Sequence, residues 1–242
     1  MLMTSKPIHF FIGLLWAVWS GSSVALNAVD EYLDISARYS HGDFDTSLNS
    51  RLYQLQFSYG KFFHGFDASV SSSLLMLSDE LGEDTGLGDL YLHAGKVLGD
   101  RRNTNHELYG SIELKLPAAD EATALGTGEA DLGLFLNYTR RIRTNSLMVM
   151  AGYMINGDSP DTRYHDIFSY GMGASGSFER WYPYVRIEGQ QQRLDSGSNP
   201  LSLNTGLFYS LAATRFIKLD TAWGLNDASA DMGITLGYVL WF

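Results

Sequence analysis

The sequence ends on the stretch GITLGYVLWF (Gly233 to Phe242), in which every second residue is apolar. Ile234, Leu236, Tyr238 and Phe242 fall on one set of alternate positions, and a period of two is typical of a β-strand with one apolar face. Terminal residues usually fray into water, where polar side chains carry no penalty. An apolar face that continues to Phe242 therefore indicates a strand whose outer side meets an apolar environment.

The same alternation recurs along the chain. Stretches of roughly 9–11 residues have the length that a tilted strand needs to cross a bilayer, and about twelve of them are present. We therefore predict an all-β fold, a transmembrane antiparallel up-and-down β-barrel of about 12 strands. The stretches are 33–39, 53–59, 68–76, 87–98, 112–116, 132–139, 147–155, 168–178, 184–190, 203–210, 217–223 and 232–242.

The width of such a barrel decides which face of its wall contacts water. Twelve strands enclose more space than side chains can fill, so an apolar interior would leave an empty hole. The polar face is rich in small residues, which suits a crowded, wet lumen. These are Ser69, Ser71, Ser73, Gly133, Gly233 and Gly237. We expect the apolar face to contact lipid.

The connections between the stretches separate by length and charge. Every second connection is long and acidic, as in SDELGEDTG (Ser78 to Gly86), whereas the others are mostly shorter and basic, as in TRRIRTN (Thr139 to Asn145). Long loops outside the cell and short turns inside are typical of the bacterial outer membrane. The pattern therefore predicts that the protein lies in the bacterial outer membrane, with both termini in the periplasm.

The first residues resemble a secretory leader. Lys6 is followed by FFIGLLWAVW (Phe10 to Trp19), a run of ten apolar residues that is too short to span a membrane. Small residues then precede a cleavage site, for which we predict Ala25 with Ala28 as the alternative. The expected organisation is a cleaved signal peptide at 1–25 and a barrel at 26–242, and a retained N-terminal anchor is the competing interpretation. The net charge of −10 argues against nucleic acid as a partner.

Two stretches share a turn pattern. TGLGDLYLHAG (Thr85 to Gly95) and LGTGEADLGLFLNY (Leu125 to Tyr138) each carry G-x-G, then an acid, then a leucine-led strand. A nucleotide site would require a helix after the glycines, and a strand follows instead. We expect tight turns at the outer rim with the acids pointing inward, and a role in binding a solute or ion is the alternative. The motif residues are Gly86, Gly88, Asp89, Gly126, Gly128 and Asp131.

These stretches carry a family resemblance. GLGDLYLHAGKVL and ELKLPAADEATALGTGEADLGLFLNYTRRI resemble the MetA-pathway of phenol degradation-like outer-membrane proteins, although Ala118 and Ala119 stand where that family has Thr-Gly. The resemblance implies a transport barrel whose solutes include hydrophobic or aromatic compounds. The ending, with Tyr238, Leu240 and Phe242, is similar to the C-terminal signal that the outer-membrane assembly machinery reads.

Charged side chains of both signs fall on the inward set of positions. They predict either a ladder of salt bridges that braces the wall or a constriction whose crossed fields orient a small polar solute. The candidates for lumen and solute contact are Arg38, Gln54, Gln56, Glu113, Lys115, Arg186, Glu188, Lys218 and Asp220. An aromatic girdle at one membrane interface is predicted from Phe178, Trp181, Tyr182 and Tyr184.

The leading functional prediction is an outer-membrane channel or transporter for small solutes. The main alternative is a structural or interaction barrel whose lumen is closed, and an enzyme is the third. RYHD (Arg163 to Asp166) is the best candidate for acid–base chemistry, but no nucleophile motif accompanies it. We expect no cofactor and no metal site. The expected partners are outer-membrane lipids, lipopolysaccharide, the barrel assembly machinery and an unidentified small solute.

Overall fold

The computed structural model describes residues 31–42, 49–63, 65–98, 105–119, 125–158, 163–193 and 198–242, so the predicted signal peptide and its cleavage site lie outside the described part. All regular elements are strands of one antiparallel sheet. They are β1 (Glu31–Gly42), β2 (Ser50–Phe63), β3 (Phe66–Asp79), β4 (Gly82–Leu87), β5 (Leu90–Leu98), β6 (His106–Leu116), β7 (Asp131–Ile142), β8 (Asn145–Ile155), β9 (Ile167–Gly176), β10 (Trp181–Gln190), β11 (Leu201–Ala212), β12 (Arg215–Gly224) and β13 (Met232–Trp241).

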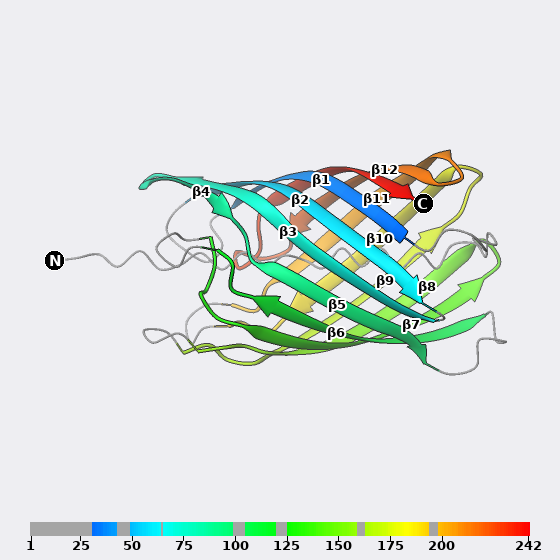
Figure 1. The fold of residues 1–242 in the computed structure, drawn as a ribbon, viewed down its shortest axis with the longest axis horizontal. Coiled ribbons are helices and arrows are strands. Elements are labelled where there is room, and N and C mark those ends of the chain that lie inside the picture. The colour runs from blue at the N-terminus through cyan, green and yellow to red at the C-terminus, as the bar shows by residue number, and fades with distance from the viewer. Residues whose placement is uncertain are drawn as a thin grey trace.

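The first and last strands close the sheet into a barrel (Figure 1). β1 pairs with β13 from Tyr32↔Trp241 to His41↔Met232. Beyond this ladder, the amide of Phe242 donates to the carbonyl of Glu31 at 3.0 Å, and the amide of Glu31 donates back at 3.2 Å. Closure leaves no row of unpaired backbone groups, which lipid could not satisfy.

The thirteen strands form a twelve-stranded wall, because β4 and β5 lie one after the other along the same edge of β3. β3 pairs with β4 through its residues 74–79 and with β5 through residues 66–71. The strand is interrupted between β4 and β5 at Gly88, whose amide donates to the Ser73 carbonyl at 2.8 Å. The twelve-strand prediction is confirmed, and the break explains why alternation is less regular over 87–98.

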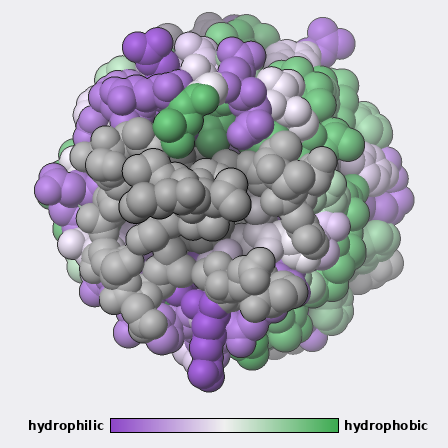
Figure 2. Space-filling view, turned by 90° about the vertical axis from the view of Figure 1, so that its left-hand side faces the viewer, coloured by the Kyte–Doolittle hydropathy of each residue, from purple (hydrophilic) through white to green (hydrophobic). Residues whose placement is uncertain are grey.

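Large apolar side chains point away from the barrel interior. Met172 is 63% exposed and Leu236 is 58% exposed, whereas Lys218 on the inner face is 2% exposed. In Figure 2, hydrophobic residues spread along the right-hand flank and hydrophilic residues gather at the rim that faces the viewer. The distribution is the inverse of a soluble domain and suits a wall that meets lipid. No helix in the described ranges is long and apolar enough to span a bilayer.

The two ends of the barrel differ. At one end, here called the Phe242 end, short turns join β7 to β8 and β11 to β12. At the other, here called the loop end, lie the longer connections 117–130, 156–166 and 191–200. The basic residues Arg140, Arg143 and Arg215 lie at the Phe242 end, as their strand positions require.

The predicted aromatic girdle is correct for two of its four residues. Phe178 and Trp181 are 56% and 48% exposed. The assignment of Tyr182 and Tyr184 was wrong, because both share the inward parity of Arg186 and Glu188. Tyr182 packs edge-on against the buried Phe216, 6.4 Å between ring centroids.

Candidate functional site

All nine predicted lumen residues lie on the inner face of the wall. Six of them are 9% exposed or less, although each carries a polar or charged group. The burial follows from close packing of side chains from neighbouring strands inside the barrel. The six are Gln54, Glu113, Lys115, Arg186, Lys218 and Asp220.

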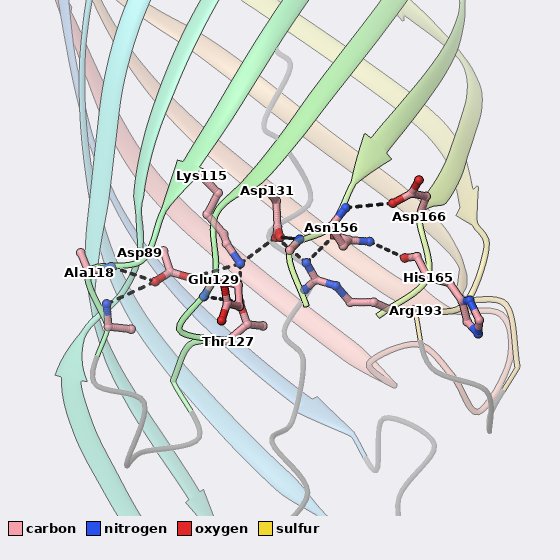
Figure 3. Close-up of polar contacts among 12 residues, drawn as sticks. Asp89, Lys115, Ala118, Thr127, Glu129, Asp131, Asn156, His165, Asp166 and Arg193 are labelled. Atoms are coloured by element: carbon pink, nitrogen blue, oxygen red, sulfur yellow. Dashed lines mark hydrogen bonds and ion pairs between the residues drawn. The ribbon is translucent and has the colours of Figure 1, made fainter. Parts of the chain in front are cut away.

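Asp131 is the centre of a polar cluster at the loop end (Figure 3). Its side chain is 2% exposed, and its Oδ2 atom lies 2.6 Å from Lys115 Nζ. Arg193, which follows β10, donates from Nη2 to the same oxygen. The other carboxylate oxygen, Oδ1, accepts from the Gly157 amide at 3.0 Å. One buried carboxylate therefore joins β6, β7 and the connections after β8 and β10.

Asp89 brings the G-x-G stretch from Thr85 to Gly95 to the same cluster. Its Oδ1 accepts from the amides of Ala118 and Ala119, both at 3.2 Å, and its Oδ2 lies 3.7 Å from Lys115 Nζ. Gly126 lies against this contact, since a Cβ there would be 2.5 Å from Ala119 Cβ. Both acids are buried at the loop end, and they share Lys115.

The described residues of the connection from β6 to β7, 117–119 and 125–130, contact the inner face of the wall. Lys115 Nζ donates to Thr127 Oγ1 at 2.6 Å, and Gly128 adopts a left-handed conformation with φ of 72°. Apolar side chains of this connection pack on the inner face of β2 and β3. The buried cluster consists of Leu52, Leu75, Leu77, Ala119 and Leu125.

The RYHD stretch serves as an anchor in the same cluster. Asp166 accepts from the Tyr153 hydroxyl at 3.0 Å and from the Asn156 amide at 3.2 Å. Asn156 in turn donates to the His165 carbonyl at 2.6 Å and accepts from Arg193. Sequence reasoning missed Asn156 and Arg193, because both lie just beyond their strands, where no periodicity marks them.

The middle of the lumen is braced by contacts that span three strands. Lys218 on β12 reaches over Gly237 of β13 to Asp34 of β1, with a 2.5 Å separation between Nζ and Oδ2. A Cβ on Gly237 would be 2.5 Å from Lys218 Cε, so only glycine leaves the path open. Tyr184 likewise donates across β11 to Asp220 Oδ1 at 2.7 Å.

Two of the inward acids differ in how their charge is compensated. Arg186 Nε lies 2.6 Å from Glu188 Oε1. Lys115 does not pair with Glu113, because Asp131 is its direct cross-strand partner and offers a closer carboxylate. Among the described residues, Glu113 makes no ion pair or side-chain hydrogen bond, although it is 4% exposed.

The inner face of β7 and β8 carries an apolar patch among polar side chains. Phe135 is 9% exposed and lies over Gly152, where a Cβ would be 2.4 Å from its ring. Met148, Met150 and Met154 share the inward parity of Gly152. Asn137 and Thr139 are buried on the same face, so the patch is bordered by polar groups. Within the described ranges, no cluster of histidines and carboxylates is placed to hold a metal ion.

Comparison with solved structures places the fold among outer-membrane barrels. The chain is similar to the KdgM porin, with 11% identity, 86% of this chain and 99% of that chain covered, and a TM-score of 0.57. It is also similar to the NanC porin, with 9% identity, 87% and 99% coverage, and a TM-score of 0.62. The translocator domain of the autotransporter NalP from Neisseria meningitidis matches with 10% identity, 88% coverage of both chains and a TM-score of 0.55.

Sequence comparison gives the family. A search among curated proteins finds no match. The family model described as "Putative MetA-pathway of phenol degradation" matches residues 35–242, which is nearly all of the barrel. The match extends the resemblance from the two G-x-G stretches to the whole wall, and the chain belongs to this family.

Proposed function

We propose that the protein is an outer-membrane channel that lets small solutes diffuse through its lumen. The observation that carries the proposal is the inverted distribution of polarity: an apolar outer wall surrounds a set of buried, charged inner side chains such as Lys218 and Glu113. Charges in such positions are tolerated where water reaches them, and a wet lumen is a path for solutes. The family membership and the porin-like fold support the same function.

The orientation is part of the proposal. The loop end carries the acidic connections and the Phe242 end carries the basic turns, which supports a loop end outside the cell and a periplasmic Phe242. Export by a signal peptide cleaved after Ala25 would deliver the chain to the periplasm. The C-terminal residues Tyr238, Leu240 and Phe242 would then mark it for the assembly machinery.

The side chains of the inner face suggest the class of solute. Phe135 and the inward methionines of β8 offer an apolar surface, and Arg186, Glu188 and Asp220 offer polar groups on β10 and β12. A small solute with an apolar body and a polar head can contact both. The family description concerns phenol degradation, and small aromatic compounds with a polar substituent fit this class.

Conductance of the refolded protein in a planar bilayer tests the proposal. A channel gives discrete single-channel steps, and an aromatic solute with a charged substituent should reduce the current in a concentration-dependent manner. Protein inserted in the correct fold that gives no steps would contradict the proposal and favour the alternative, a structural barrel whose lumen is closed.

A further inference from the structure

A row of inward residues crosses five neighbouring strands on the inner face of the wall. Arg38 on β1 pairs in register with Thr235 on β13, and Thr235 pairs with Asp220 on β12. The row continues through Gly206 on β11 to Tyr184 on β10. Arg38 and Asp220 therefore face the lumen at the same register, with one short side chain between them.

These two residues line a cavity of about 50 Å³. The strand between them contributes Gly233 and Thr235, whose small side chains leave the space open. Two strand spacings, about 10 Å, separate the backbones of Arg38 and Asp220, so the cavity lies between opposite charges. Its remaining side chains are Tyr184, Arg186, Glu188, Asn204, Thr221 and Ala222.

Each of the two charges retains unused hydrogen-bonding capacity. Within the described part of the chain, the hydrogen bond of the Arg38 guanidinium is the one from Nε to Ser40 Oγ at 3.0 Å. Asp220 is 9% exposed, and its Oδ1 accepts from Tyr184. Its Oδ2 is buried and has no hydrogen-bond partner among the described residues. A buried carboxylate oxygen without a donor is unfavourable unless a ligand or water supplies one.

The second pair of charges in the cavity wall is already compensated. Arg186 and Glu188 form an ion pair at 2.6 Å, and Asn204 donates to Glu188 at 3.1 Å. Among the described residues, Arg38 and Asp220 form no such ion pair, although Lys218 and Arg186 lie near enough to attract Asp220. An anionic solute would be repelled by Asp220 and a cationic solute by Arg38, whereas a zwitterion complements both.

We propose that this cavity binds the zwitterionic head of a small α-amino acid. The solute carboxylate accepts from the Arg38 guanidinium, whose planar donors match a carboxylate. The solute ammonium donates to the exposed edge of the Asp220 carboxylate, which is 9% exposed. The site deepens the proposed function, since solutes reach the cavity only through an accessible lumen.

Ligand-observed NMR of the refolded protein in detergent micelles tests the site with glycine, acetate, methylammonium and glycine betaine. Glycine should bind about tenfold more tightly than acetate or methylammonium, each of which lacks one of the charge-assisted contacts. Glycine betaine keeps both charges but has no N–H donor for Asp220, so it should bind more weakly than glycine. Equal binding of glycine and glycine betaine would overturn the proposal without any variant being made.

Variants locate the binding. Arg38→Gln and Asp220→Asn should each weaken glycine binding about tenfold, and Arg38→Lys should weaken it less, because the charge remains. Glu107→Gln is the matched control, since Glu107 on β6 pairs with Arg141 outside the cavity and its loss should leave glycine binding unchanged. Equal loss in Glu107→Gln, or no loss in Arg38→Gln and Asp220→Asn, would overturn the site. Because this assay requires no current, glycine binding without conductance would contradict the channel and leave the site standing.

Discussion

Lys115 Nζ lies 2.6 Å from Asp131 Oδ2, and these two residues are direct register partners at the loop end of β6 and β7. The ion pair closes the base of the connection 117–130, whose described residues contact the inner face of the wall. Arg193 shares the same carboxylate oxygen and ties the connection after β10 to it. Asp131 therefore holds the connections at the loop end in one arrangement.

Asp131→Asn should release this arrangement. The substitution removes the carboxylate that pairs with Arg193 and leaves Lys115 only the more distant Asp89, at 3.7 Å. Breaking a buried pair costs about 3–5 kcal/mol. The cost falls on the connections rather than on the wall, because the strand ladders are untouched. We expect faster proteolysis within 117–130 and larger, noisier single-channel current.

Asp227→Asn provides the comparison for that variant, because Asp227 is an exposed acid in the connection between β12 and β13. It should behave as the unmodified protein in both assays. Unchanged proteolysis and unchanged current in Asp131→Asn would show that Asp131 does not hold the loop end together.

Gly237→Ala should weaken the barrel wall. The added Cβ would lie 2.5 Å from Lys218 Cε and 3.0 Å from Ser36 Cβ, so Lys218 could no longer reach Asp34 along its present path. We expect a lower temperature for the loss of the compact, heat-modifiable form on electrophoresis. Gly233→Ala on the same strand and the same face is the control, because its nearest neighbour would be 3.3 Å away. A similar shift in both variants would contradict the role of the Lys218 crossing.

Changes on the lipid face of β13 should reduce assembly. Leu236 is 58% exposed and lies in the middle of the strand, so Leu236→Asp places a charge against lipid. The free-energy cost of this charge should be below the roughly 2–4 kcal/mol of Arg or Lys at the bilayer midplane.

Phe242→Ala should lower the amount of assembled barrel in cells by removing the terminal aromatic. Leu225→Asp, in an exposed connection, should assemble normally, and normal surface levels of all three would refute this account.

The lumen should give a modest preference for cations. Acids outnumber bases at the inward positions, and Glu113 has no cationic partner among the described residues. The low-dielectric wall focuses this field, which salt screens over about 10 Å at 0.1 M. Glu113→Gln should reduce the reversal potential in a salt gradient, and an anion preference of the unmodified protein would contradict the charge argument.

The wall of this barrel could be predicted from the sequence, because its determinant is local. A strand that faces lipid on one side and water on the other must alternate, and every outward position from Met232 to Phe242 is apolar. Parity then places Glu113, Arg186 and Lys218 in the lumen without any knowledge of their partners. The error over Tyr182 and Tyr184 came from counting aromatic residues near a turn instead of applying that parity.

The partners of these residues could not be predicted in the same way. Which carboxylate Lys115 contacts depends on the register of β6 against β7, and the reach of Lys218 to Asp34 joins residues 184 positions apart. Arg193 lies outside any strand, so no period marks it. The reason for a glycine at position 237 becomes clear only once the structure shows that the Lys218 side chain crosses it.

Single-channel recording of the refolded barrel in a planar bilayer tests the central claim most directly. A lumen lined by charged and polar side chains predicts discrete conductance steps, with a modest cation preference that fades as the salt concentration rises. A correctly folded, inserted barrel that shows no conductance at any salt concentration would contradict the claim that solutes pass through this protein.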